Sequence, residues 1–384
     1  MAIPASLLQV ILKNEEGCSS MEGRTTLKRI LDIARWAPSG DNTQPWRFEI
    51  VDSNSVVVHG FDTRQDCVYD LQGRASQLSI GALLETIAIA ASTYGLRVDA
   101  QRRGDAPDAQ PTFDVKFSTD TEIMEDPLVP FITERSVQRR RLRVRPLTLT
   151  EKQALESSVG VHYEVKWLEG WGNRFRAARL MFRNAKLRMI MPEAYQVHRR
   201  VIEWNAIYSK DRIPQAALGV SPPTAWLMRW VMRSWARVEF FNTYLAGTFI
   251  PRLEMDFMPS MACAAHFVIV GRKAPESIDD YILAGRSVQR FWLTATKLGL
   301  RHQPEMTPLI FAGYLKEGIA FTKKEDVKLF AVSTAADTCK LIGDDLVRAV
   351  WVGRIGEGPA AKARSHRLHL ENLLVSDGAV HEYR

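Results

Sequence analysis

The arginines between residues 135 and 145 are the part of the sequence best suited to bind a phosphorylated group. The run begins Arg135-Ser136-Val137-Gln138-Arg139 and continues with Arg140, Arg141, Arg143 and Arg145. Arginine presents forked N–H donors that match phosphate oxygens, and serine adds a hydroxyl. A solvated basic face and a nucleic-acid contact are the alternatives. A nucleic-acid contact would favour aromatic residues between the arginines, and none lies between Glu134 and Pro146.

A second candidate site lies in the polar turn within residues 34–51. Pro38 ends an amphipathic helical pattern, and Ser39, Gly40, Asp41 and Asn42 are turn formers. After Pro45 the residues alternate between apolar and polar, which predicts a half-buried strand. A loop held between a helix and a strand can present backbone N–H groups rigidly to a ligand, although an ordinary connection has the same pattern.

Periodicity predicts further helices and strands on both sides of these segments. Helices are expected over 75–94, 151–160, 172–191 and 279–298, and strands over 46–51, 56–58, 113–117, 267–270 and 347–352. Val352-Gly353-Arg354-Ile355-Gly356 is expected to be a glycine-rich turn that follows the last of these strands. The chain therefore mixes helices and strands, as in an α+β fold.

The turn and the strand after it resemble the signature loop of the FMN-dependent nitroreductase family. The matching residues are Ala-Pro-Ser-Gly-Asp-Asn-Thr-Gln-Pro-Trp-Arg-Phe, from residue 37 to residue 48. By this resemblance Pro38, Ser39 and Asn42 are flavin contacts. Gln44, Pro45 and Trp46 are expected to anchor the loop.

The same resemblance assigns the arginine run to the FMN phosphate. It implies that Arg135 and Arg139 bind the phosphate, with Ser136 and Gln138 as helpers. Many family members have an aromatic residue where Leu142 stands, a difference that affects packing more than charge.

Two later segments also resemble flavin-binding parts of the family. The segment after Gly299-Leu300 looks like the one that passes the flavin ring, where a backbone N–H meets ring N5. The corresponding residues here are Gln303, Pro304, Glu305 and Met306. Near the end, Ser365 and Arg367 match a basic pair that returns to the phosphate, with serine at the position of the usual lysine.

An internal similarity indicates how the chain is organised. Residues 81–97 and 285–301 align without gaps, and both begin with glycine and end with Gly-Leu-Arg. The few identities leave chance as a competitor. We expect an N-terminal arm over 1–23 and two related halves over 24–130 and 131–384. This arrangement resembles the fused, Acg-type branch of the family, in which one chain forms an intramolecular pseudo-dimer. A homodimer is the alternative.

Residues 192–262 are rich in tryptophan and other aromatic residues and are interrupted by prolines. We expect this segment to be a helical insertion. Three interpretations stay open: core packing of the inserted helices, a lid or pocket wall over the flavin, and a helix on a membrane surface.

Composition narrows the class of protein. The 384 residues carry a net charge of +7, which favours anionic ligands. The four cysteines are scattered and the histidines have no ligand spacing, so neither a metal site nor a disulfide framework is expected. The N-terminus has no basic leader, and no apolar run reaches the length of a membrane span. We expect a cytoplasmic protein without stable membrane insertion.

These features together predict an FMN-dependent oxidoreductase that transfers electron pairs through flavin N5 to or from a small organic substrate. One FMN is expected, NADH or NADPH is a candidate electron donor, and no side-chain catalytic residue is identified. A sealed flavin-storing or flavin-sensing protein is one alternative. A basic module that binds nucleic acid or a membrane surface is the other.

Overall fold

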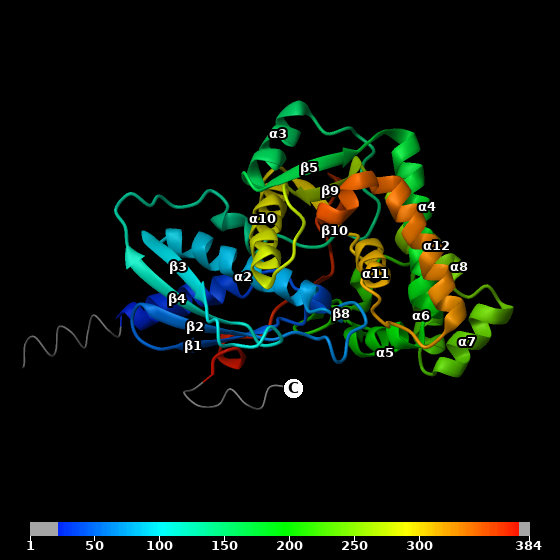
Figure 1. The fold of residues 1–384 in the computed structure, drawn as a ribbon, viewed down its shortest axis with the longest axis horizontal. Helices are drawn as coiled ribbons and strands as arrows, with labels where there is room; N and C mark the ends of the chain where they lie inside the picture. Colours follow the sequence, from blue (N-terminus) through cyan, green and yellow to red (C-terminus); the bar gives the residue numbers. More distant parts are fainter. Residues whose placement is uncertain (1–21, 376–384) are drawn as a thin grey trace, which may run out of the picture.

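The computed structural model describes residues 22–375, and the fold is α+β (Figure 1). The expected arm over 1–23 lies almost wholly outside these residues. Two antiparallel four-stranded sheets stand on either side of a pair of long helices, α2 and α10. A group of further helices, α4 to α8, lies beside the second sheet.

The first sheet is built by the N-terminal part of the chain. A helix over 22–34 leads into it, and the sheet order is β1-β2-β4-β3. Its elements are β1 (Trp46–Ile50), β2 (Ser55–Gly60), α2 (Arg74–Ser92), β3 (Leu96–Arg102) and β4 (Thr112–Thr119). Trp46, Phe48 and Ile87 are fully buried in the core between the sheet and its helices.

The second sheet repeats the order of the first, as β5-β9-β11-β10. A helix again precedes two strands, a long helix and two more strands. These elements are α3 (Leu149–Ser158), β5 (Tyr163–Leu168), β9 (Ala265–Gly271), α10 (Ile278–Lys297), β10 (Leu300–Pro304) and β11 (Ala349–Glu357). Two helices, α11 (Thr307–Lys316) and α12 (Glu325–Ile342), connect β10 to β11.

The expected glycine-rich turn at 352–356 is wrong, because these residues lie inside β11. The glycines are needed there by close neighbours. A Cβ on Gly353 would lie 2.5 Å from His302 Nε2, and one on Gly356 would lie 3.0 Å from the backbone nitrogen of Ala264. Crowding by the neighbouring strands, rather than a change of chain direction, therefore accounts for glycine at both positions.

Helices α2 and α10 cross at the two glycines that begin the internal similarity. A Cβ on Gly81 would lie 2.0 Å from the carbonyl oxygen of Ile282, and one on Gly285 would lie 2.1 Å from that of Leu78. The contact is reciprocal, since the same offset relates both pairs, as at a two-fold interface. The small residues let the two backbones touch.

Replacing Gly81 with alanine is expected to lower the free energy of unfolding by about 1–3 kcal/mol, because the new Cβ meets backbone atoms of α10. Gly172 in α4 is the matched control, since nothing lies within 4 Å of a Cβ there. At that helical position alanine should stabilise the fold by about 0.5–1 kcal/mol. Urea unfolding of both variants tests the opposite signs. A Gly81→Ala variant as stable as the wild type would contradict the close crossing.

The insertion lies between β5 and β9, so it begins near residue 169 rather than at residue 192. Its helices are α4 (Gly170–Ile190), α5 (Pro192–Val201), α6 (Pro222–Val231), α7 (Trp235–Tyr244), α8 (Phe249–Arg252) and α9 (Met258–Met261). Three two-residue strands accompany them: β6 (Ile202–Glu203), β7 (Tyr208–Ser209) and β8 (Ile213–Pro214). Leu187, Met191 and Val197 of this group pack with Phe311 of α11 in a separate apolar core.

The last described segment leaves the second sheet and packs on the first. Strand β12 (Arg364–Ser365) pairs with β7, and Leu370 and Leu373 are buried in the core of the first sheet. The backbone N–H of Phe48 donates to the carbonyl oxygen of Leu373. This path places Arg367 beside the loop at 38–44, where its side chain contacts Asn42.

Within the described residues, one helix, α2, is long and apolar enough to cross a membrane by length and composition. It is a core helix of this fold, since 83% of its most apolar window is buried inside the protein.

Candidate functional site

A cavity of about 770 Å³ lies between the N-terminal part of the chain, α10 with the strands beside it, and the helices inserted between β5 and β9. Its volume is in the range of cofactor and ligand sites. Eleven of the thirteen residues that the resemblance assigns to the cofactor line it. They are Pro38, Ser39, Asn42, Arg135, Ser136, Arg139, Gln303, Pro304, Met306, Ser365 and Arg367. The loop near Ser39 and the arginine run, about a hundred residues apart in the chain, therefore face the same space.

The loop at 38–44 is held in an unusual backbone conformation. Asp41, Asn42 and Gln44 all have positive φ, at 50°, 65° and 49°, a region that residues other than glycine rarely adopt. Such conformations persist where the surroundings fix them, often at functional sites. Ser39 Oγ accepts a hydrogen bond from the Gln44 backbone N–H at 3.0 Å.

Gln44 anchors this loop from beneath. Its side chain is fully buried, donates to the carbonyl oxygen of Lys210 at 2.9 Å, and accepts from the backbone N–H of Leu368 at 2.9 Å. Asn42 Oδ1 accepts from Arg367 Nη1 at 2.8 Å. The insertion and the C-terminal segment therefore both fix the loop at the cavity wall.

Three arginines form a cationic cluster at one part of the cavity, in which Arg135 and Arg367 are buried and Arg364 is half-buried. Arg135 is 3% exposed, packs its guanidinium over Trp292 at 4.6 Å, and donates to the Trp36 carbonyl oxygen. Arg364 packs over the Trp36 ring and donates to the carbonyl oxygen of Arg135. Arg367, 7% exposed, donates to the carbonyl oxygen of Ala37.

No carboxylate balances this arginine cluster within the described residues. Burial lowers the pKa of Arg135 well below its usual value, and the charges of Arg367 and Arg364 lower it further. Burial and Arg364 likewise lower the pKa of Arg367 to about 9. The Nε atoms of Arg135 and Arg364 are buried and have no hydrogen-bond partner among residues 22–375. Because buried charges are normally paired, a dianionic group such as a phosphate fits this cluster.

Arg139 lines the cavity apart from the arginine cluster. Its guanidinium donates to the carbonyl oxygen of Ala217. Burial lowers the pKa of Arg139 to about 10, against the opposing effect of Asp41. Arg135 and Arg139, which the sequence assigns to one phosphate, thus have different surroundings. Arg364, which the sequence analysis missed, joins Arg135 instead, and the only signal for it was a basic residue next to the expected pair.

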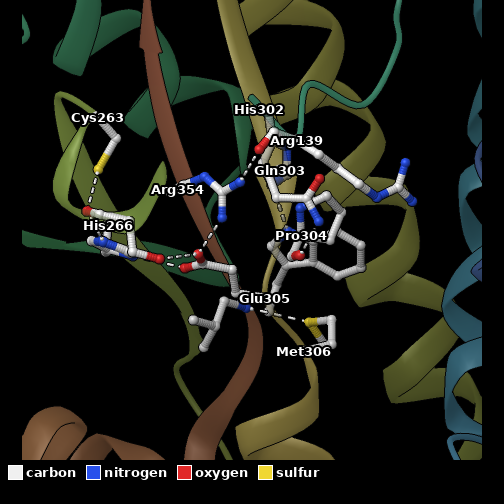
Figure 2. A network of polar contacts seen from close by, with 12 residues as sticks. Arg139, Cys263, His266, His302, Gln303, Pro304, Glu305, Met306 and Arg354 are labelled. Carbon is white, nitrogen blue, oxygen red and sulfur yellow. Dashed lines mark hydrogen bonds and ion pairs between the residues drawn. The ribbon is translucent and has the colours of Figure 1, made fainter. Parts of the chain in front are cut away.

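Gln138 and Glu305 are the two predicted residues that do not line the cavity. Gln138 donates its amide to the carbonyl oxygen of Pro359 and accepts from the backbone N–H of Arg140, so its side chain fixes the arginine run in place. Glu305 is 6% exposed and points away into a buried polar network (Figure 2). Both act on the site through their neighbours.

The buried network joins β9, β10 and β11 behind the cavity wall. Glu305 Oε2 lies 2.7 Å from His266 Nδ1, and Arg354 Nη1 donates to Glu305 Oε1 at 2.8 Å. Arg354 also donates through Nη2 to the carbonyl oxygen of Arg139. His266 Nε2 lies 3.0 Å from the carbonyl oxygen of Ser260. Figure 2 shows Glu305 between His266 and Arg354, with Gln303 and Pro304 on the opposite side of the strand.

The charges of this network support one another. Burial by itself would lower the pKa of His266, but the Glu305 carboxylate raises it to about 10. Burial by itself would raise the pKa of Glu305, but His266 and Arg354 lower it to about 2. The network therefore carries a histidinium, a carboxylate and a guanidinium at neutral pH, and it fixes the position of residues 303–306.

Met306 offers an unused backbone donor to the cavity. The backbone N–H of Glu305 donates to the carbonyl oxygen of Val352, and Pro304 has no N–H. The N–H of Met306 has no partner within residues 22–375, and Met306 precedes the first turn of α11 without a side-chain cap. The N-terminal end of a helix favours negative charge. An electron-rich ring edge would be stabilised there.

The insertion supplies the remaining wall of the cavity. Its side chains there are mostly apolar, including Met228, Met232 and Phe241. A tyrosine–histidine pair adds polarity: Tyr69 Oη lies 2.8 Å from His198 Nε2. Burial lowers the pKa of His198 to about 3, so its imidazole is neutral. Nothing in the sequence signalled this pair, because Tyr69 and His198 come from different halves of the chain.

Comparison with known proteins supports the class that the fold and the loop indicate. Residues 24–78 match the model of the nitroreductase family, which confirms the resemblance found in the loop. The fold as a whole is α+β. The fused two-half branch lies beyond this match and stays a prediction.

A crystal structure of a nitroreductase-like family protein from Bacillus cereus resembles the chain at 12% identity and a TM-score of 0.32. The likeness covers 66% of this chain and 97% of that one. No curated protein matches the sequence significantly.

Proposed function

We propose that this chain binds one FMN non-covalently in the cavity and acts as an FMN-dependent oxidoreductase. The observation that carries the proposal is the arginine cluster, in which two buried guanidinium groups and one half-buried group line the same cavity as the nitroreductase-type loop, without a carboxylate partner among residues 22–375. A phosphate would neutralise these charges and satisfy the buried Nε atoms of Arg135 and Arg364.

The other predicted residues would hold the rest of the cofactor. Ser39 and Asn42 line one wall, and Gln303, Pro304 and Met306 line another. When bound, FMN supplies reversible two-electron transfer at N5. The N–H of Met306 and the start of α11 would favour negative charge near the ring. The chain thus positions the cofactor and tunes its potential, with Glu305 holding residues 303–306 in place.

The apolar wall supports a small organic substrate with limited charge. Met228, Met232 and Phe241 exclude water from the cavity on the side of the insertion, which favours substrates such as quinones, enones or nitro compounds. NADH or NADPH remains the candidate electron donor. In this proposal residues 192–262 serve as both pocket wall and core, so two of the three interpretations of the segment hold together.

One flavin per chain is proposed, at the interface of an intramolecular pseudo-dimer. The reciprocal crossing at Gly81 and Gly285 and the repeated sheet order support two related halves. A hollow of about 320 Å³ beside His162 and Lys273 has no arginine cluster, since Lys273 pairs with Asp280 at 2.8 Å. A second phosphate has little to bind there.

Purification tests the proposal directly. The protein is expected to be yellow, or to become so with added FMN, to release FMN on heating, and to hold about one flavin per chain. A colourless protein that cannot be reconstituted would refute FMN binding. Stopped-flow reduction by NADH and by NADPH separates an enzyme from a flavin-storing protein. A bound flavin that neither donor reduces, and that no quinone or nitro acceptor reoxidises after reduction by dithionite, would favour storage.

A further inference from the structure

The insertion carries an outer face of exposed apolar and aromatic side chains. Helices α6, α7 and α8 lie at one end of the molecule, away from the first sheet (Figure 1). Trp226 is 69% exposed and Tyr244 is 72% exposed. The outer face consists of Trp226, Leu227, Trp230, Phe240, Tyr244, Leu245, Phe249 and Ile250. Single exposed apolar residues are normal, but so many within 25 positions mark an interaction site.

Ring contacts join several members of the outer face. Phe240 lies 5.2 Å from Tyr244 between ring centroids, and both Trp230 and Phe240 contact Phe241, at 5.7 Å and 6.1 Å. The Arg237 guanidinium packs over the Trp230 ring at 4.5 Å. Aromatic residues from α6 and α7 therefore form one patch instead of separate exposed side chains.

The charge of these helices is strongly biased. Residues 222–252 contain four arginines and a single acidic residue, Glu239. Glu239 is paired with Lys324 at 2.7 Å. Arg229 lies in α6, Arg237 lies in α7 and Arg233 lies between these two helices, whereas Arg252 is buried. The face thus combines tryptophan and tyrosine with unneutralised arginine, the combination that suits the headgroup region of an anionic bilayer.

We propose that the outer face of α6–α8 binds the surface of an anionic phospholipid bilayer. The aromatic side chains enter the headgroup region, and the three arginines contact lipid phosphates and carboxylates. The protein lies on the membrane without crossing it. A second copy of the chain would repel such a basic face, because both partners would bring the same arginines.

The outer face and the cavity share side chains, so membrane binding would affect access to the cavity. Leu227, Leu245 and Ile250 are exposed and also line the cavity. A bilayer on this face would therefore lie against the apolar wall of the site. This consequence rests on the proposed function, and it favours substrates dissolved in the membrane over charged ones.

Co-sedimentation with vesicles tests the inference on the full chain. Vesicles of phosphatidylcholine with 30% phosphatidylserine should bind the protein tenfold or more above pure phosphatidylcholine, since each arginine near the surface contributes roughly fivefold. Replacing Trp226 and Tyr244 together by serine should reduce this binding about tenfold. Arg233→Glu should have a similar effect and should weaken the dependence on phosphatidylserine.

Matched variants show whether the outer face is responsible. Trp171 of α4 is 67% exposed, so Trp171→Ser removes an equally exposed tryptophan elsewhere and should leave binding unchanged. Arg141→Glu makes the same charge change in the basic run at 135–145 and should have little effect. Equal binding to both vesicles, no binding, or equal losses in the controls would overturn the proposal. So would a lipid-free dimer that Trp226→Ser/Tyr244→Ser dissociates. None of these readouts involves flavin, so the proposal can fail while the proposed function stands.

Discussion

Replacing Glu305 with glutamine is expected to lower the free energy of unfolding by about 3–5 kcal/mol, the usual cost of breaking a buried ion pair from one side. Glu305 is the only carboxylate that Arg354 and His266 contact in the described part of the chain. The variant leaves the Arg354 guanidinium buried and unneutralised, and the lost partner cannot be replaced by water. Urea unfolding of the flavin-free protein at pH 6 measures the effect.

The pH dependence of this stability loss shows whether the ion pair of Glu305 and His266 causes it. The pKa of Glu305 is lowered to about 2, so its contribution is present above pH 4.5 and is lost as the pH falls toward 2. The pKa of His266 is raised to about 10, so its contribution is present below pH 6.5 and is lost as the pH rises toward 10. The deficit of Glu305→Gln should therefore be largest between pH 4.5 and 6.5 and smaller at pH 9.5.

A more exposed pair provides the control for this prediction. Glu317 pairs with Arg74 at 2.8 Å, and its side chain is 37% exposed. Glu317→Gln should cost at most about 1 kcal/mol, because solvent screens the pair. Equal costs for the two variants, or a deficit of Glu305→Gln that does not change between pH 6 and pH 9.5, would contradict the buried charge network.

The role of Glu305 shows where inference from the sequence ended. The resemblance identified residues 303–306 as a segment beside the flavin ring, and three of the four do line the cavity. Glu305 follows the last residue of β10, and its side chain is buried behind the cavity wall between two residues that line the cavity. Its partners, His266 and Arg354, come from strands 39 and 49 positions away. No local pattern could pair them.

The loop at 38–44 was easier to find because its signal is local. Turn residues between a helical and an alternating pattern predicted both neighbouring elements correctly, and the family match confirms the resemblance. The positive φ angles of Asp41 and Gln44 could not be predicted. The Gln44 side chain is held by Lys210, which lies within the insertion, and by Leu368 near the end of the chain, and neither contact is visible in the local sequence.

The internal similarity became interpretable only with the structure. Glycine at positions 81 and 285 is one of the few identities, and no local pattern explains it. The helix crossing provides that reason, since each glycine touches a backbone carbonyl of the other helix. Strands β3 and β10 were not assigned from periodicity, and β5 was missed because its alternation is short and partly charged.

Replacing Arg135 with methionine is expected to weaken FMN binding about 10–100-fold while leaving the flavin-free protein as stable as the wild type or more stable. The loss corresponds to about 1.5–3 kcal/mol for charge-assisted hydrogen bonds to the phosphate. The gain in stability arises because methionine fills much of the same volume without a charge, and Arg364 and Arg367 no longer repel a third buried cation. Arg367 Nη2 still lies 3.5 Å from the Trp36 carbonyl oxygen that Arg135 would leave.

Riboflavin, which lacks the phosphate, makes the test specific. Arg135→Met should raise the dissociation constant for FMN and leave that for riboflavin nearly unchanged, so the preference for FMN over riboflavin collapses. Arg139→Met should preserve this preference, because Arg139 lies with Asp41 apart from the arginine cluster. Arg141→Met, at an exposed position, should change neither constant. Fluorescence titration of the apoprotein with both ligands measures all of them. If Arg139→Met removes the preference and Arg135→Met does not, the phosphate belongs beside Asp41, and the buried cluster needs another anion.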